Sequence, residues 1–217
     1  MNDSIIGALA GFSTATLSDA LDRLGRPGAV FDLPPLGSHL SMAGRAYTVR
    51  YVPAAFPPGT VGDYLDDVPE GAVVVLDNQA RTDCTVWGDI LTAVASARGV
   101  AGTLIDGVCR DTKRAFDLSY PIYSRGHFMR TGKDRVEVAA VQETVSIGGT
   151  QIKPGDLIVG DRDGVVVIPR DCEDDVLELA REIHEREEGI LARALAGATI
   201  AEARAAFGYH SLQRRQA

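Results

Sequence analysis

The chain has 217 residues, 45% of them hydrophobic and 24% charged, which is typical of a globular protein with a real core. Its formal net charge of −8 disfavours nucleic acids and anionic membranes as partners, although a small anion could still bind at a locally cationic site. No stretch reaches the roughly 20 apolar residues that span a bilayer, the opening residues lack the basic region of a signal peptide, and the three cysteines have no paired spacing. We therefore expect a reduced, cytoplasmic protein without a membrane segment or zinc knuckle.

The first part of the chain predicts one helix, a loop and a strand. A short amphipathic helix is predicted to follow Ser13 and Thr14, and Gly25 supplies its stop. Segment 26–41 is rich in Pro and Gly and predicts a loop, whereas residues 44–52 alternate in polarity and predict a strand.

From residue 68 onward, apolar strands alternate with short helices. The predicted elements are a turn and strand over 68–78, a helix over 87–99, a strand over 102–106, a helix over 111–118 and a strand over 121–126. This β-α-β-α-β order implies parallel strand pairing, and the continuous apolar runs suit strands that are buried on both faces.

The pattern then changes to short strands separated by turn residues. Strands are predicted within 135–141, 144–152, 156–161 and 164–169, with Gly-Gly, Pro-Gly-Asp and Asp-Gly turns between them. A long helix is predicted from about Cys172 to Ala196, one more helical piece over 199–207, and a frayed tail over 208–217. We expect a single α/β domain over residues 1–217, with its core between about 13 and 196.

The sharpest chemical feature is the segment DGVCRD (106–111), which directly follows a buried strand. Open α/β sheets place ligands at the carboxyl ends of their strands, and Arg110 and Asp111 would be delivered there. The Arg110 guanidinium can fork onto a carboxylate or an enolate oxygen. The Asp111 carboxylate is a hard oxygen ligand for magnesium or manganese. The alternative is that the Arg-Asp pair only caps the next helix.

The second feature is WGDIL (87–91), at the start of a predicted helix. The backbone N–H groups of Gly88, Asp89, Ile90 and Leu91 would lie in the first turn, where free N–H groups and the helix dipole bind anions. Asp89 could contact a metal through water, or it could simply favour a helix N-terminus electrostatically. Because the features lie one βα unit apart, they should meet at the same edge of the sheet, as a metal-assisted site requires.

Other candidates are weaker. Cys109 lies beside the proposed site, but it has no nearby His partner in sequence that would mark it as a nucleophile. Segment 161–164 faintly resembles a calcium loop, yet a hairpin turn explains it better. The Glu- and Arg-rich face around 181–193 is typical of a solvated helix, and His39, His127, His184 and His210 show no metal-ligand spacing.

Four segments together resemble the RraA-like family: WGDIL (87–91), GVAGTLIDGVCRD (99–111), YPIYSRG (120–126) and VSIGGTQIKPGDLIVGDRDGVVVIP (145–169). The resemblance extends from about residue 13 to 190. Members of this family include 4-hydroxy-4-methyl-2-oxoglutarate / 4-carboxy-4-hydroxy-2-oxoadipate aldolases, which also decarboxylate oxaloacetate, and regulators of ribonuclease E activity. The resemblance implies a β/β/α sandwich similar to a swivelling phosphohistidine domain, assembled as a homotrimer or homohexamer.

The aldolase branch is marked by an Asp, twenty intervening residues and then Arg-Asp, a spacing that Asp89, Arg110 and Asp111 meet. By resemblance, the N–H groups of residues 88–91 would bind substrate oxygens and Arg110 would bind the 2-oxo or enolate oxygen. Asp111 would ligate Mg²⁺ or Mn²⁺ directly, and Asp89 would do so through water. The family also uses a Glu from the C-terminal helix of a neighbouring subunit, for which Glu187 and Glu188 are the nearest matches.

The resemblance therefore implies a class II, metal-dependent aldolase and oxo-acid decarboxylase, a carbon–carbon lyase that releases pyruvate from a small 2-oxo acid through an enolate. One alternative is a non-catalytic regulator that binds and inhibits a ribonuclease, although a pure binder has no physical need for the intact Asp89, Arg110 and Asp111 set. Another is a lyase for a different hydroxy-oxo acid, because the far wall of the pocket depends on loops 26–41 and 53–67.

Overall fold

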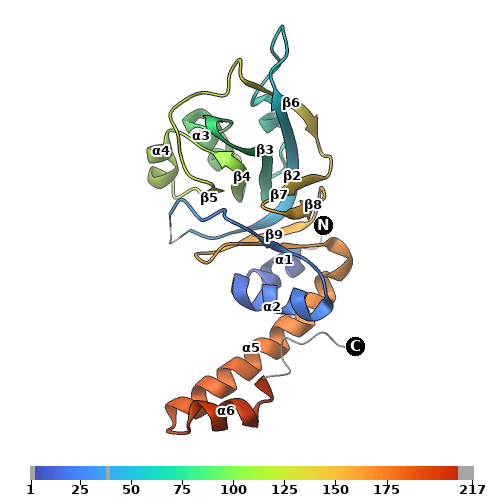
Figure 1. Cartoon of the computed structure of the whole chain (residues 1–217), viewed down its shortest axis with the longest axis vertical. Coiled ribbons are helices and arrows are strands. Elements are labelled where there is room, and N and C mark those ends of the chain that lie inside the picture. Colours follow the sequence, from blue (N-terminus) through green and yellow to red (C-terminus); the bar gives the residue numbers. More distant parts are fainter. Residues whose placement is uncertain (1–2, 38–39, 210–217) are drawn as a thin grey trace.

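The computed structural model describes residues 3–37 and 40–209, and one mixed sheet organises them (Figure 1). Its strand order is β1-β10-β9-β2-β3-β4-β5, and β6 pairs with β2. The strands are β1 (Ala29–Val30), β2 (Met42–Pro53), β3 (Ala72–Thr85), β4 (Gly102–Val108), β5 (Ile122–Ser124), β6 (Val136–Val141), β9 (Leu157–Gly160) and β10 (Val165–Ile168).

Strands β3, β4 and β5 are parallel, as the β-α-β-α-β pattern predicted, and β2 also pairs parallel to β3. The connections contain the helices η1 (Asp63–Asp67), α3 (Asp89–Ala97) and α4 (Thr112–Asp117). Strand β3 runs past its predicted end at residue 78. Gln79 and Ala80 adopt left-handed backbone conformations with φ of 56° each, and pairing with β4 resumes at Arg81. The extra residues form a bulge that interrupts the ladder without ending the strand.

The predicted strands of the second half also form, and most of them extend the same sheet. Strands β6, β9 and β10 pair antiparallel to their neighbours. Strands β7 (Val145–Ile147) and β8 (Thr150–Ile152) make a separate two-stranded ribbon. Its turn consists of Gly148 and Gly149, with φ of 52° and 81°, a conformation that favours glycine. Residues Asp161 to Gly164 form the hairpin turn predicted for this segment, closed by the Asp161 N–H donating to the Gly164 carbonyl at 3.0 Å.

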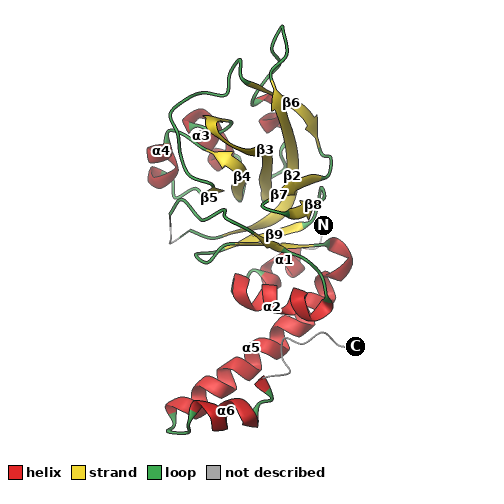
Figure 2. Ribbon diagram, viewed as in Figure 1, coloured by secondary structure: helices red, strands yellow, loops and turns green. Residues whose placement is uncertain are grey.

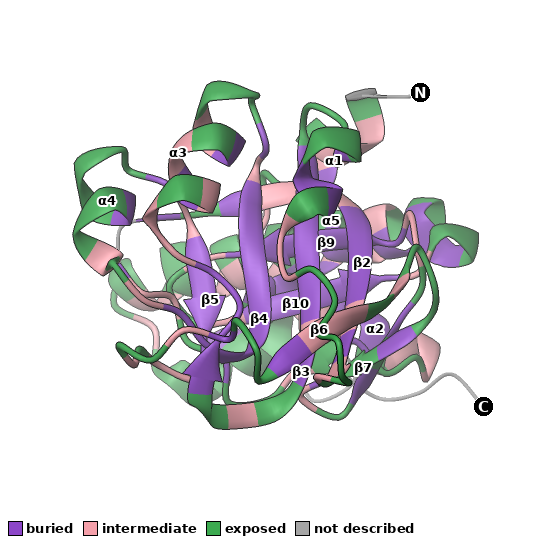
Figure 3. Cartoon of the chain, turned by 90° about the horizontal axis from the view of Figure 1, so that it is seen from above, coloured by how far each residue is buried: buried purple, intermediate pink, exposed green. Residues whose placement is uncertain are grey.

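The sheet curls, so that one of its faces encloses a shared core (Figures 2 and 3). Alternate residues of β3 and β4 pack there against alternate residues of β9 and β10 and against the β7–β8 ribbon. On the outer face of the parallel half, Ala95 of α3 and Ala115 of α4 cover Val74, Leu76 and Ile105. A third core lies outside the antiparallel half, beneath the N-terminal and C-terminal helices. This β/β/α arrangement confirms the predicted fold class.

The remaining helices are α1 (Asp3–Leu9), α2 (Thr14–Leu24), η2 (Arg170–Cys172), α5 (Glu173–Leu195) and α6 (Ile200–Ala206). The Ser13 hydroxyl caps α2 by accepting from the Thr16 N–H at 3.1 Å, and Gly25 ends the helix with φ of 69°, as predicted. Helix α1 was not predicted, yet its Leu9 is fully buried. Of the predicted frayed tail, residues 210–217 lie outside the described residues. Within the described ranges, no helix combines the length and apolar character needed to cross a membrane.

Candidate active site

Arg110 and Asp111 lie where the sequence predicted them, at the carboxyl end of a buried parallel strand. Strand β4 ends at Val108, and α4 begins at Thr112. The backbone N–H of Arg110 donates to the carbonyl of Trp87 at 3.0 Å, which ties the end of β4 to the start of α3. The two sequence features therefore meet at one edge of the sheet.

A pocket of about 240 Å³ opens at this junction. Arg110 and Asp89 bring charged side chains to it, and most of the other wall is apolar. Its lining residues are Val61, Gly62, Thr85, Val86, Trp87, Gly88, Asp89, Ile90, Leu91, Arg110 and Thr131. A guanidinium beside a carboxylate in a small, largely apolar hollow suits a small, partly charged organic molecule.

Asp111 holds a position in which its carboxylate faces back toward Arg110. Its φ of 53° and ψ of 39° are left-handed, a conformation that Asp adopts more readily than most residues. One of its oxygens, Oδ2, lies 3.3 Å from Nε of Arg110. Although Asp111 occupies the N-cap position of α4, its side chain makes no capping hydrogen bond. The carboxylate is thus available to a ligand, which weakens the alternative that the pair only caps α4.

Gly88 lets the backbone of the α3 start approach both charged side chains. A Cβ atom at this position would lie 3.0 Å from Oδ2 of Asp111 and 3.2 Å from Nε of Arg110, closer than side chains normally pack. Gly88 itself has an extended conformation, with φ of −146°, that any residue can adopt. Glycine is therefore favoured here by the close approach of these two side chains and not by backbone geometry.

One backbone N–H group in the first turn of α3 is already hydrogen-bonded, to the side chain of Asp89. Oδ1 of Asp89 accepts a hydrogen bond from the Ile90 N–H at 2.9 Å. This bond supports the electrostatic role that Asp89 can play at a helix N-terminus. It also engages one of the N–H groups predicted to bind substrate, so that a ligand at Ile90 would have to displace the Asp89 carboxylate. The side chain of Ile90 is 73% exposed at the rim of the pocket.

The far wall of the pocket comes from a predicted loop and from an unpredicted one. Val61 and Gly62, in loop 53–67, line it as expected. None of the described residues of loop 26–41 lines the pocket, and Asp32 of this loop pairs instead with Arg125 at 3.0 Å. Thr131 was missed by the sequence analysis. It reaches the pocket because the chain after β5 runs beside Thr85, a long-range contact that no local pattern signals.

His127, which no sequence pattern placed near Arg110, also lies close to the site. It lines a smaller hollow of about 140 Å³ that Arg110 also borders, together with Asp111, Thr112, Phe128 and Met129. A single backbone bridge between Cys109 and His127 holds the two segments together. The thiol of Cys109 is fully buried, and burial raises its pKa, so that it stays protonated and is a poor nucleophile.

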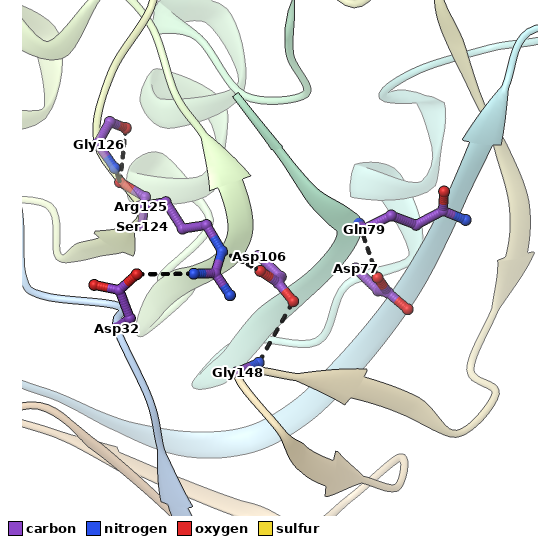
Figure 4. A network of polar contacts seen from close by, with 8 residues as sticks. All are labelled: Asp32, Asp77, Gln79, Asp106, Ser124, Arg125, Gly126 and Gly148. Atoms are coloured by element: carbon purple, nitrogen blue, oxygen red, sulfur yellow. Dashed lines mark hydrogen bonds and ion pairs between the residues drawn. The ribbon is translucent and has the colours of Figure 1, made fainter. Parts of the chain in front are cut away.

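Asp106, the first residue of the DGVCRD segment, belongs to a different polar network (Figure 4). Its Oδ1 accepts from Nε of Arg125 at 2.6 Å, and the same guanidinium pairs with Asp32. Oδ2 of Asp106 accepts from the Gly148 N–H at 3.4 Å. These contacts join β4, the chain after β5, the N-terminal loop and the β7–β8 turn, and they make Asp106 a structural residue.

Glu187 and Glu188 do not reach this pocket within one described chain. They lie on α5, which packs mainly against α2 and α6 and extends from the lower end of the molecule in Figure 1, away from α3 and α4. Burial and the nearby Asp19 raise the pKa of Glu187, whereas His184 lowers it. A role for either glutamate at the pocket would require a second subunit.

The carboxylates near Arg110 suit a hard cation that keeps several water ligands better than a cation that is fully enclosed by protein ligands. Among the described residues, no three His, Cys, Asp or Glu side chains gather closely enough to hold a metal ion. Mg²⁺ usually keeps several waters and binds through one or two carboxylates together with its substrate. Two carboxylates fit this pattern. Asp89 lines the pocket, and the half-exposed, uncapped Asp111 lines the smaller adjoining hollow, which Arg110 also borders.

Comparison with known proteins identifies relatives along most of the chain. The family model RraA-like, described as Aldolase/RraA, matches residues 14–167. Protein DlpA of Legionella pneumophila is 37% identical over 210 residues, which cover 95% of this chain but 34% of DlpA. This chain therefore spans about a third of the length of that relative.

Two further relatives point to different activities. A protein of Halalkalibacterium halodurans, whose name proposes that it is a 4-hydroxy-4-methyl-2-oxoglutarate aldolase, is 35% identical over 177 residues and 81% of each chain. The crystal structure of Streptomyces coelicolor RraAS2, described as an unusual member of the RNase ES inhibitor RraA protein family, has a TM-score of 0.77 and 28% identity to this chain. That match covers 85% of this chain and 94% of RraAS2.

Proposed function

The chain belongs to the RraA-like family, and we propose that it is a divalent-metal-dependent lyase that cleaves a small 2-oxo acid and releases pyruvate. The observation that carries this proposal is the close approach of Gly88, Arg110 and Asp111, which we call the Gly88 corner. There the guanidinium of Arg110 and the carboxylate of Asp111 lie 3.3 Å apart beside a pocket large enough for a small oxo acid. The name of the Halalkalibacterium relative supports the same class of reaction.

Arg110 would hold the 2-oxo oxygen of the substrate. When the bond between C3 and C4 breaks, its electron pair moves into the C2–C3 bond and the carbonyl oxygen gains negative charge. A planar guanidinium can stabilise that charge by donating two N–H hydrogen bonds to the oxygen. Preorganised donors of this kind typically lower barriers by roughly 3–4 kcal/mol each. Protonation of C3 then yields pyruvate.

The same bond-breaking step serves two substrate types. In a 4-hydroxy-2-oxo acid, the C4 hydroxyl loses its proton and C4 leaves as a carbonyl compound. In oxaloacetate, C4 leaves as carbon dioxide. Mg²⁺ or Mn²⁺, held directly by Asp111 and through water by Asp89, would supply the additional positive charge next to the 2-oxo group. The apolar wall around Val61 and Leu91 would exclude water from the carbon that becomes charged.

We further propose that the protein assembles as a trimer or hexamer and that Glu187 or Glu188 of a neighbouring subunit completes each site. In one chain α5 extends away from α4 and the end of β4 (Figure 1), whereas the exposed Ile90 lines the pocket. Helix α5 also leaves Leu191 and Leu195 51% and 80% exposed, an apolar surface that a second subunit could cover.

The test is pyruvate formation by the purified protein with Mg²⁺, using oxaloacetate and 4-hydroxy-4-methyl-2-oxoglutarate as substrates. Because metal ions decarboxylate oxaloacetate on their own, the Arg110→Ala variant serves as the blank. Arg114→Ala, an exposed arginine one turn further along, is the matched control. Activity in wild type and Arg114→Ala but not in Arg110→Ala supports the proposal. Equal rates in all three would contradict it.

The second candidate is a ribonuclease regulator without catalysis, favoured by the similarity to RraAS2. Its acidic surface would bind a basic region of the partner. This candidate predicts inhibition of a ribonuclease E-type enzyme that survives Arg110→Ala, together with no pyruvate from any 2-oxo acid. A different hydroxy-oxo acid as substrate would instead show as pyruvate release from another member of a substrate panel.

A further inference from the structure

The hydroxyl of Thr92 lies one turn into α3 and uses both of its hydrogen-bonding functions. It donates to the carbonyl of Gly88 at 2.8 Å and accepts from the indole Nε1–H of Trp87 at 2.9 Å. Both Thr92 and Trp87 are 1% exposed, so that water cannot replace either partner. A hydroxyl has a single hydrogen, and here it is committed to Gly88.

Each partner of Thr92 touches the candidate site directly. The carbonyl of Trp87 accepts from the backbone N–H of Arg110 at 3.0 Å. The backbone of Gly88 lies against the side chains of Arg110 and Asp111, as the short distances from its would-be Cβ show. Thr92 therefore links the two backbone segments that carry the charged groups, although its own side chain does not line the pocket.

We propose that Thr92 is a positioning residue for Arg110 and for the Gly88 corner, and this role rests on the proposed lyase function. The hydroxyl fixes the tilt of the Trp87 indole and the direction of the Gly88 carbonyl at the same time. Trp87 is also stacked on Tyr120, with the two rings 8° from parallel and their centroids 6.3 Å apart, so that one face of the indole is already fixed. The bond to Thr92 holds the indole at its Nε1 end.

Removal of the Thr92 hydroxyl should disturb the position of Trp87 more than it disturbs the packing of the core. Thr92→Val keeps the shape of the side chain but leaves the indole N–H buried without an acceptor, a situation that proteins avoid. The indole can regain a hydrogen-bond partner only if Trp87 moves. The backbone carbonyl of Trp87 would then shift the Arg110 N–H that is bonded to it. A displacement of about 1 Å of a catalytic group typically costs on the order of 100-fold in rate.

The experiment compares three variants of the full chain. Thr92→Val removes the hydroxyl, and Thr92→Ser retains it while removing the methyl group. Thr48→Val is the matched control, because Thr48 is equally buried and its hydroxyl donates to the carbonyl of Glu143, and neither residue lines the pocket. All three are measured for kcat, KM and unfolding midpoint, and for the fluorescence of Trp87, the one tryptophan of the sequence.

We expect Thr92→Val to lose at least roughly 10-fold in kcat with less than about a threefold change in KM, because Arg110 acts on the transition state. Its Trp87 emission should shift, since the indole loses its polar partner. Thr92→Ser should stay within about threefold of wild type in kcat, with unshifted emission. Thr48→Val should lose stability but retain kcat.

The outcomes separate this inference from the proposed function. Active wild type with an unchanged kcat in Thr92→Val overturns the positioning role and leaves the lyase function standing. An equal loss of kcat in Thr92→Val and Thr48→Val also overturns it, because any buried hydroxyl would then matter as much. Wild type that forms no pyruvate from any 2-oxo acid overturns the proposed function, and the positioning role with it.

Discussion

Nε of Arg110 lies 3.3 Å from Oδ2 of Asp111, although neighbouring side chains in an extended strand point to opposite faces. The left-handed backbone of Asp111, with φ of 53°, turns its carboxylate back toward the guanidinium. The arrangement places a fixed cation and a hard oxygen ligand on the same side of the chain. Each group therefore restrains the position of the other.

The first prediction concerns Arg110→Lys. The substitution keeps the charge but replaces a planar fork with a point charge that cannot bridge two oxygens. We expect kcat to fall roughly 100-fold, with a smaller change in KM, if Arg110 stabilises the enolate-like transition state. Arg114→Lys, on the exposed side of α4, should behave as wild type. A raised KM at unchanged kcat would instead assign Arg110 to ground-state binding.

The second prediction is that activity requires a divalent cation. Asp111 and Asp89 offer hard oxygen ligands, and no soft-ligand cluster accompanies them among the described residues. Exhaustive chelation followed by dialysis should abolish pyruvate formation, and Mg²⁺ or Mn²⁺ should restore it. Binding of the ion should also raise the unfolding midpoint of the wild type more than that of Asp111→Asn. Full activity of verified metal-free protein would rule the requirement out.

The third prediction tests the close approach at Gly88. In Gly88→Ala the new methyl group would meet Oδ2 of Asp111 at 3.0 Å and Nε of Arg110 at 3.2 Å, so both side chains must move aside. Because the ends of these side chains are flexible and the backbone is unstrained, stability should change little. Activity should fall roughly 10- to 100-fold.

The control for this substitution is Gly7→Ala. Gly7 lies in α1, and a Cβ atom there meets no other atom within 4 Å. Alanine in place of a helical glycine should leave activity unchanged and stabilise the protein slightly, by about 0.5–1 kcal/mol. Wild-type kcat in Gly88→Ala would show that the contact with Arg110 and Asp111 is not needed for the reaction.

Strands and helices with strong periodicity were predictable from the sequence because their signals are local. The apolar runs of β3 and β4 and the caps of α2 at Ser13 and Gly25 are of this kind. The meeting of Gly88 with Arg110 was predictable too, since parallel topology alone brings a helix start and the next strand end to one edge.

Features that depend on long-range packing were not predictable. The bulge at Gln79 and Ala80, the approach of Thr131 to Thr85 and the place of His127 beside Asp111 follow from how distant segments pack. Thr92 was overlooked for a related reason. A threonine inside a helix is common, and only the positions of Trp87 and Gly88 in space give its hydroxyl a function.

The fourth prediction concerns stability and pH at Asp161. Its carboxylate accepts from the Thr14 N–H at 2.8 Å and from the Thr14 hydroxyl at 2.7 Å, which joins the β9–β10 turn to the start of α2. Burial opposes ionisation, but the hydrogen bonds outweigh it and lower the pKa of Asp161 below its usual value. This stabilisation should be complete above the unfolded-state pKa of about 4 and should be lost as the pH falls through the lower folded-state value.

Urea unfolding of Asp161→Asn measures this contribution. At pH 7 the variant should be less stable than wild type by about 2 kcal/mol, because hydrogen bonds to a charged acceptor are lost. The difference should shrink as the pH is lowered below about 4. Asp163→Asn, an exposed residue in the same turn, should show neither effect. A constant difference between pH 7 and pH 3 would mean that the charge of Asp161 is not responsible.

The last prediction is that each site is shared between two subunits. Glu187 and Glu188 lie on α5, which extends away from α4 and the end of β4 in Figure 1, so we expect them to serve the pocket of a neighbouring chain. Two full-length variants, Arg110→Ala and the double variant Glu187→Ala/Glu188→Ala, should each be inactive alone. Mixed oligomers made by co-expression should regain partial activity, since some interfaces would then combine an intact Arg110 with an intact helix α5.

Co-expression of Arg110→Ala with Asp111→Ala is the control, because both changes damage the same half of the site and no interface can restore it. Light scattering measures the assembly. A monomer, or no recovery of activity in mixed oligomers of proven composition, would mean that each chain builds its site alone.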